Sequence, residues 1–139
     1  MAYNLLSGKK GIIFGALNEK SIAWQVAEKA FEEGAQFTLT NTPAAIRFGT
    51  INELAETCNA EVIPVDATRV DHLEKLIDRT MEIFDGQIDF VLHSIGMSFN
   101  VRKGLTYEDV NYDFFQKTLD ISALSFHKLL KVAKQRDAI

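Results

Sequence analysis

Short apolar runs alternate with amphipathic segments along this chain. Four runs, at residues 12–14, 37–40, 62–65 and 88–93, have the length and the β-branched, aliphatic and aromatic content of buried β-strands. The segments between them, at residues 21–33, 51–58 and 70–84, place apolar residues at the three- and four-residue spacing of a helix. The pattern therefore predicts four strands that alternate with helices.

The predicted helices differ in how clearly the sequence defines them. In residues 21–33, Ser21 and Gly34 stand where helix caps are favoured. The buried face of this helix is predicted to consist of Ile22, Ala23, Val26, Ala27, Ala30 and Phe31. The polar stretch 41–50 is predicted to be a loop. Residues 112–135 are predicted to form one long last helix, whose apolar arc is wider than one face of a sheet covers.

Regular alternation of strands and helices is typical of a parallel sheet with right-handed crossovers. The simplest strand order is 3-2-1-4, and Pro64 supports it because a residue without a backbone N–H is tolerated at a sheet edge. The predicted fold class is therefore α/β, a Rossmann-like three-layer sandwich. Ligands of such sheets bind at the carboxyl ends of the strands, near the point where the strand order reverses.

Composition narrows the class of protein further. The chain has 139 residues, the size of one domain, and its formal net charge of −4 disfavours a nucleic-acid binder. No apolar run approaches the ~20 residues of a membrane span, and the first ten residues do not resemble a secretory signal. Cys58 is the single cysteine, which excludes an internal disulfide and favours the reducing cytoplasm. We expect no metal site.

The loop after the first strand has the parts of a phosphate site without a standard motif. Gly15 permits a close backbone approach, and Ser21 and the helix start offer a hydroxyl and unpaired N–H groups. Leu17 and Lys20 occupy the positions of the later glycines in G-x-G-x-x-G, so that motif is absent. A plain strand–loop–helix connection with a serine cap explains the same residues, and both interpretations stay open.

The other strand ends also carry polar residues or glycine. After the second strand, Asn41 and Thr42 could bind a ribose, and Arg47 could pair with a 2′-phosphate, although polar loop residues explain all three. After the third strand, Asp66 could accept a hydrogen bond from an adenine amino group or could simply end the strand. His93 has no acidic residue placed to orient it and is interpreted as structural.

Four segments taken together resemble the enoyl-[acyl-carrier-protein] reductases of bacterial fatty-acid synthesis, which belong to the short-chain dehydrogenase/reductase superfamily. Their order and spacing are specific, although each segment alone is weak, and the resemblance runs from about Leu6 to the last residue. The segments are Gly15-x5-Ser21-Ile22-Ala23, Asp66-Ala67, His93-Ser94-Ile95-Gly96, and Asp120-Ile121-Ser122 with Ser125-Phe126.

The resemblance implies a cofactor, NADH with NADPH not excluded, and a set of residues that hold it. The resemblance implies that Gly15, Ser21 and Ile22 bind the pyrophosphate. It implies that Thr42, Asp66 and Ala67 bind the adenosine. Ser94, Ile95 and Gly96 would line the adenosine and nicotinamide-ribose side. Ser98 is assigned to the border of the acyl pocket. The substrate implied is a trans-2-enoyl thioester on acyl carrier protein or coenzyme A.

The sequence departs from the family pattern at its end. Family members place a catalytic Tyr-x6-Lys pair after a fifth strand, but here the chain stops at Ile139, where that strand is expected. Tyr3 and Lys10 have the same spacing but precede the first strand, so we interpret them as a coincidence. No catalytic residue is therefore assigned.

We accordingly expect residues 1–139 to be the amino-terminal dinucleotide-binding part of such a reductase, truncated before the fifth strand and inactive alone. The alternatives are a nucleotide-binding or assembly module without catalysis, or a piece that completes a site with a separate carboxyl-terminal half. The open edge of the fourth strand and the wide apolar surface of the last helix predict a homo-oligomer. No nucleic-acid or membrane partner is expected.

Overall fold

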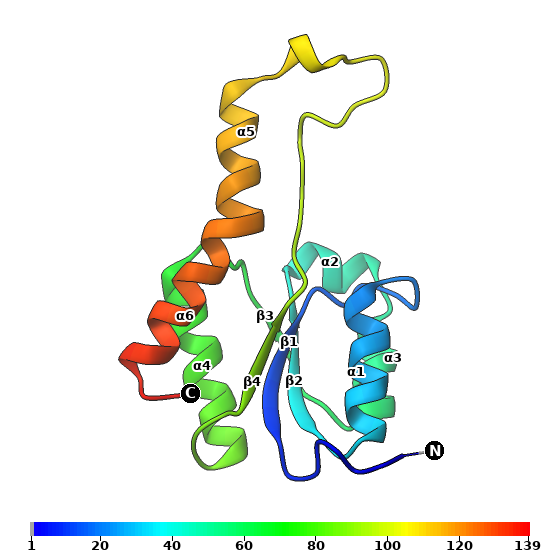
Figure 1. Cartoon of the computed structure of the whole chain (residues 1–139), viewed down its shortest axis with the longest axis vertical. Coiled ribbons are helices and arrows are strands. Elements are labelled where there is room, and N and C mark those ends of the chain that lie inside the picture. The colour runs from blue at the N-terminus through cyan, green and yellow to red at the C-terminus, as the bar shows by residue number, and fades with distance from the viewer. Residues whose placement is uncertain (1) are drawn as a thin grey trace.

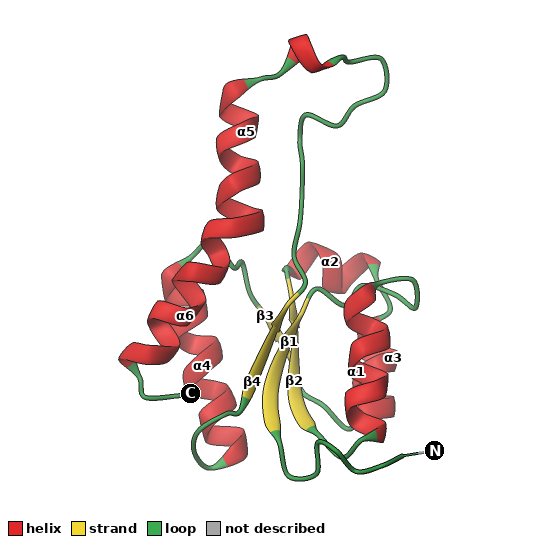
Figure 2. Cartoon of the chain, viewed as in Figure 1, coloured by secondary structure: helices red, strands yellow, loops and turns green. Residues whose placement is uncertain are grey.

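A four-stranded parallel sheet forms the centre of the protein, as a computed structural model of residues 2–139 shows (Figures 1 and 2). The strands are β1 (Lys10–Phe14), β2 (Gln36–Asn41), β3 (Val62–Pro64) and β4 (Phe90–His93). Their order is β3-β2-β1-β4, which confirms the predicted topology, with Pro64 on the outer strand β3. Together with the helices on both faces, this is the expected Rossmann-like arrangement.

Helices cover both faces of the sheet and create two separate cores. α1 (Ile22–Glu32) and α3 (Ile51–Cys58) lie on one face, and α4 (Val70–Phe84) and α6 (Ser125–Gln135) lie on the other (Figure 2). Side chains alternate along β1, so Ile13 belongs to the first core while Ile12 and Phe14 belong to the second. All three are buried, as expected for the central strand of a parallel sheet.

The predicted loop at residues 41–50 is wrong, because it contains the short helix α2 (Pro43–Phe48). Thr42 is its N-cap residue, and the Thr42 hydroxyl accepts a hydrogen bond from the Ala45 N–H at 3.2 Å. Pro43 occupies the first turn, where its missing N–H costs nothing. The Thr-Pro signal was present in the sequence, but the helix is too short to show an apolar period.

The predicted buried face of α1 is partly wrong. Ala23, Ala27 and Ala30 are buried as predicted, whereas Ile22, Val26 and Phe31 are 74%, 37% and 41% exposed. The small alanines let the helix approach the sheet closely, and Trp24 rather than the larger aliphatic residues completes the buried stripe. Gly34 ends the helix as predicted, with a φ of +91°.

The long last helix is interrupted. α5 (Tyr112–Leu119) leads into one turn of π-helix at Asp120–Leu124, which we call the π turn, and α6 follows it directly. α6 packs on α4, but α5 projects away from the sheet and buries none of its residues (Figure 1). Within residues 2–139, no helix is long and apolar enough to cross a membrane.

A buried polar pair joins β2 to α4. The hydroxyls of Thr38 and Thr80 lie 3.0 Å apart, and both residues are fully buried. A buried hydroxyl that loses its partner keeps its desolvation cost without the compensating bond. The pair therefore contributes to stability only while both members are present.

We predict that Thr80→Val lowers the free energy of unfolding by about 1–3 kcal/mol, because it leaves the Thr38 hydroxyl without a partner. Combining it with Thr38→Val removes both polar groups and should recover most of that loss. Urea unfolding of the single and double variants measures the coupling. Additive losses in the double variant would contradict the prediction.

Candidate functional site

A cleft of about 440 Å³ lies at the carboxyl ends of the four strands. Its walls come from the loops after all four strands and from the π turn, which contributes Ile121. The cleft brings together seven of the predicted site residues: Gly15, Thr42, Asp66, Ala67, Ser94, Ile95 and Gly96. Residues as far apart in the sequence as Phe14 and Ile121 thus line one surface.

Three predicted site residues do not line this cleft: Ser21, Ile22 and Ser98. The Ser21 hydroxyl accepts hydrogen bonds from the N–H groups of Leu17 (2.9 Å) and Asn18 (3.0 Å), and it donates to the Asn18 carbonyl. Ser21 is therefore the N-cap residue of α1 by position, but its side chain orders the preceding loop and caps no helical N–H. The expectation of a side-chain cap is wrong.

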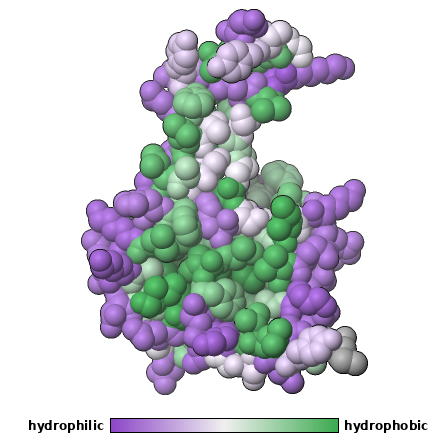
Figure 3. All heavy atoms as spheres, viewed as in Figure 1, coloured by the Kyte–Doolittle hydropathy of each residue, from purple (hydrophilic) through white to green (hydrophobic). Residues whose placement is uncertain are grey.

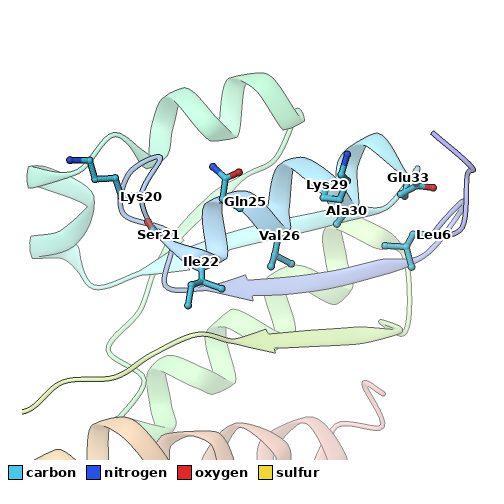
Figure 4. A pocket seen from close by; sticks show the side chains of 9 residues that line it. All are labelled: Leu6, Lys20, Ser21, Ile22, Gln25, Val26, Lys29, Ala30 and Glu33. Carbon is cyan, nitrogen blue, oxygen red and sulfur yellow. The ribbon is translucent and has the colours of Figure 1, made fainter. Parts of the chain in front are cut away.

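Ile22 lies on a separate apolar groove of about 520 Å³ along the outside of α1 (Figure 4). Figure 4 shows Ile22 and Val26 pointing from α1 to the same side, and Leu6 borders them from the preceding segment. Polar residues also border the groove: Lys20, Ser21, Gln25, Lys29 and Glu33. It differs from the cleft because it runs along one helix and has neither the glycines nor the strand-end loops that line the cleft.

Two glycines of the cleft serve different purposes. Gly15 has a φ of +96°, and a Cβ there would lie 1.9 Å from the Ser94 carbonyl oxygen. Glycine is therefore required at position 15 mainly because the loops after β1 and β4 approach each other closely. The approach of a ligand is a secondary reason. Gly96 has no atom within 4 Å of a Cβ position, so its missing side chain leaves open space in the cleft.

Asp66 presents a carboxylate to the cleft. Its Oδ1 accepts hydrogen bonds from the Thr68 hydroxyl (2.7 Å) and the Thr68 N–H (3.0 Å), and its backbone N–H donates to Nδ1 of His72. Burial alone would raise the pKa of Asp66, but the two bonds from Thr68 and the nearby His72 and Arg69 together hold it below its ordinary value. Oδ2 has no hydrogen-bond partner among residues 2–139 and is free to accept one.

The residues after β2 are mostly committed to the fold. The Asn41 side-chain amide donates to the Ala16 carbonyl (2.9 Å), and its oxygen accepts from the Thr42 N–H (2.8 Å). Asn41 therefore ties the loop after β1 to the loop after β2. Arg47 is exposed and lies outside the cleft lining, so it stays a solvated charge in this structure.

Thr40 is a cleft residue that the sequence did not single out. Its hydroxyl is buried and has no hydrogen-bond partner within the described chain. It is next to Phe14 in the β1–β2 register and lines the same cleft. Buried hydroxyls normally find a partner, so the unpartnered Thr40 hydroxyl is an exception among the buried side chains of the described residues. No sequence signal distinguishes it from Thr38, two residues earlier on the same face.

His93 lies beside the cleft in a packed position. Its ring is between Phe14 and Phe126, with centroid distances of 6.1 Å and 5.2 Å, and its Nε2 is 2.8 Å from the Ser125 hydroxyl. Burial lowers the pKa of His93, so the ring is neutral near pH 7. These contacts join β4 to α6 and fit the structural role predicted for it.

The pair with Tyr-x6-Lys spacing lies far from the cleft. Lys10 begins β1, at the opposite end of the strands, and its ammonium donates to the Phe84 carbonyl at 2.8 Å. Tyr3 is 70% exposed in the segment before β1. Neither residue is placed to act on a ligand in the cleft.

Comparison with known proteins identifies the family of this chain. The family model described as enoyl-(acyl carrier protein) reductase matches residues 15–138. The chain belongs to the enoyl-(acyl carrier protein) reductase family. It is 35% identical over 133 residues to the NADH-type enoyl-[acyl-carrier-protein] reductase 2 of Rhizobium meliloti, covering 94% of this chain and 48% of the relative.

Other relatives give the same coverage. The FabI reductase of Rickettsia felis is 35% identical over 144 residues, covering 100% of this chain and 52% of the relative. The crystal structure of a FabI–NADH complex from Alistipes finegoldii is 67% identical with a TM-score of 0.95, and the match covers 99% of this chain and 48% of that one. The chain thus spans about half the length of the relatives it matches.

We predict that alanine at the two cleft glycines changes stability by very different amounts. Gly15→Ala should lower the free energy of unfolding by about 3 kcal/mol, because the new Cβ meets the Ser94 carbonyl in a left-handed backbone conformation. Gly96→Ala should change it by less than about 0.5 kcal/mol, since its Cβ points into open space. Thermal unfolding measures both, and equal losses would contradict the assignment.

Proposed function

We propose that this chain is the amino-terminal, cofactor-binding part of an NADH-dependent enoyl-[acyl-carrier-protein] reductase, a single dinucleotide-binding unit over residues 1–139. The observation that carries the proposal is the convergence of all four strand-end loops on one cleft, which holds seven of the nine positions expected for the cofactor. The whole enzyme would reduce trans-2-enoyl thioesters. This chain alone would bind the cofactor without turnover.

The cleft fits a dinucleotide in two respects. The open space at Gly96 leaves room for a flat ring against the backbone. Oδ2 of Asp66, kept ionised, would accept a hydrogen bond from the adenine amino group. When bound, NADH supplies the hydride that the family reaction transfers.

The start of α1 would receive the pyrophosphate. The N–H groups of Ile22 and Ala23 have no hydrogen-bond partner among residues 2–139, and the helix dipole is positive at this end. Ser21 would contribute indirectly, because its hydroxyl fixes the Leu17–Asn18 backbone that precedes the helix. Ser98, which follows the cleft residue Met97, would border the acyl pocket.

The test is NADH binding to the purified chain and to Gly96 variants. Gly96→Val should weaken binding at least tenfold, about 1.4 kcal/mol, because the side chain occupies the space left for the ring. Gly96→Ala should have a smaller effect, and Thr57→Ala, an exposed change on α3, should have none. Calorimetry measures the affinities. Absence of binding by the unaltered chain, or equal affinities for all variants, would contradict the proposal.

We also propose that the chain associates with itself and resides in the cytoplasm. β4 is an edge strand, and all four of its residues are partly exposed. Figure 3 shows apolar residues gathered over the middle of this face, between α1 and α6. These helices carry the exposed residues Ile22, Val26, Phe126 and Leu130. Apolar areas of this kind support association with another chain.

Light scattering across micromolar concentrations should show a species larger than a monomer. Phe126→Asp should shift that species toward monomer if α6 forms the contact, because Phe126 is 41% exposed on that helix. Tyr107→Asp, on a 91% exposed residue outside the apolar face, is the matched control. A monomer at every concentration would refute the association.

A further inference from the structure

The π turn lies at the edge of the cleft, where it contributes Ile121 to the lining. It carries Asp120, Ile121 and Ser122, and Ser125 follows it at the start of α6. The Ser125 hydroxyl donates to the Ile121 carbonyl at 2.7 Å, a bond that competes with regular helix geometry. Turns of π-helix inside longer helices occur often at functional sites.

Ser122 holds the loop after β4. Its hydroxyl accepts a hydrogen bond from the Met97 N–H at 3.0 Å and donates to the Met97 carbonyl at 3.3 Å. Within the part of the chain that the structure describes, the backbone of residues 95–98 forms no hydrogen bond except these two. One hydroxyl on the π turn therefore supplies the polar attachment of the segment that contains Gly96.

Lys128 holds the loop after β3. Its ammonium is 2.6 Å from Oδ1 of Asp120, on the π turn, and donates to the Thr68 carbonyl at 2.8 Å. Thr68 in turn binds Oδ1 of Asp66. The side chain is 28% exposed, so the ion pair is partly shielded from water. The same helical segment thus attaches to both sides of the cleft.

We infer that the π turn is a clamp that positions the two cofactor loops, with Ser122 as the positioning residue of the loop after β4 and Lys128 as that of the loop after β3. The inference rests on the proposed cofactor site for its functional consequence. A flexible segment must be ordered before it can bind, so loosening either attachment lowers affinity without removing a group that touches the ligand.

Amide hydrogen exchange of the unliganded chain tests the attachments directly. Ser122→Ala should speed exchange of the Met97 amide at least about fivefold, the size of one net hydrogen bond. Lys128→Met should speed exchange in residues 67–69 about tenfold, since its bonds are charge-assisted. Neither variant should alter the amides of Ile12 and Ile13 in β1, which report global opening.

Two further variants separate positioning from a general loss of helix stability. Thr118→Ala removes a hydroxyl one turn earlier, which among the described residues bonds only to the Phe114 carbonyl of α5. This change should leave the loop after β4 unchanged. Ser122→Thr retains a hydroxyl and should restore slow exchange. Unchanged exchange at Met97 in Ser122→Ala, or an equal increase in Thr118→Ala, would overturn the inference.

NADH calorimetry on the same variants tests whether the clamp affects cofactor binding. Ser122→Ala should bind at least threefold more weakly than the unaltered chain, with Thr118→Ala unchanged and Ser122→Thr restored. An unchanged affinity in Ser122→Ala would overturn the functional role of the clamp. If the unaltered chain binds no NADH, the proposed function fails, and the exchange result still decides whether Ser122 and Lys128 hold the loops.

Discussion

The close approach of the loops after β1 and β4 is the constraint on which the cleft depends. β1 lies between β2 and β4, and the strand order reverses there, because β2 and β3 are added on one side of β1 and β4 on the other. Gly15 meets the Ser94 carbonyl so closely that no side chain fits between them. Because these two loops touch, the loops after β2 and β3 form the facing wall, and the space between the walls becomes the cleft.

Hydrogen bonds between loops keep these walls in place. Asn41 connects the loop after β1 to the loop after β2, and Ser122 and Lys128 attach the loops after β4 and β3 to the last helical segment. Ser21 orders the turn that leads into α1. Many polar side chains around the cleft are therefore used to hold backbone segments in place. Oδ2 of Asp66 has no hydrogen-bond partner among the described residues and stays available to a ligand.

The sequence predicted the sheet well because buried parallel strands and amphipathic helices have distinct periods. The bounds of α3 and α4 and the position of Pro64 on an outer strand follow from spacing and backbone chemistry alone. The buried face of α1 could not be predicted in this way. Whether Trp24 or Ile22 is buried depends on how closely three alanines let the helix approach the sheet.

The site, too, has features that the sequence predicts and features that only the structure shows. Glycines and polar residues at strand ends could be found in the sequence, since parallel strands bring their carboxyl ends to one edge. The roles of Ser21, Ser122 and Thr40 could not, because each depends on which backbone atoms lie within reach of a hydroxyl. The π turn has no sequence signature, and residues 112–135 show only a continuous apolar helix.

A crystal structure of this chain with NADH would test the central claim most directly. The adenine should lie beside Asp66, the pyrophosphate at the N–H groups of Ile22 and Ala23, and the remaining ring over Gly96. Cofactor bound in the apolar groove along α1, or a cleft that stays empty at saturating NADH, would contradict it.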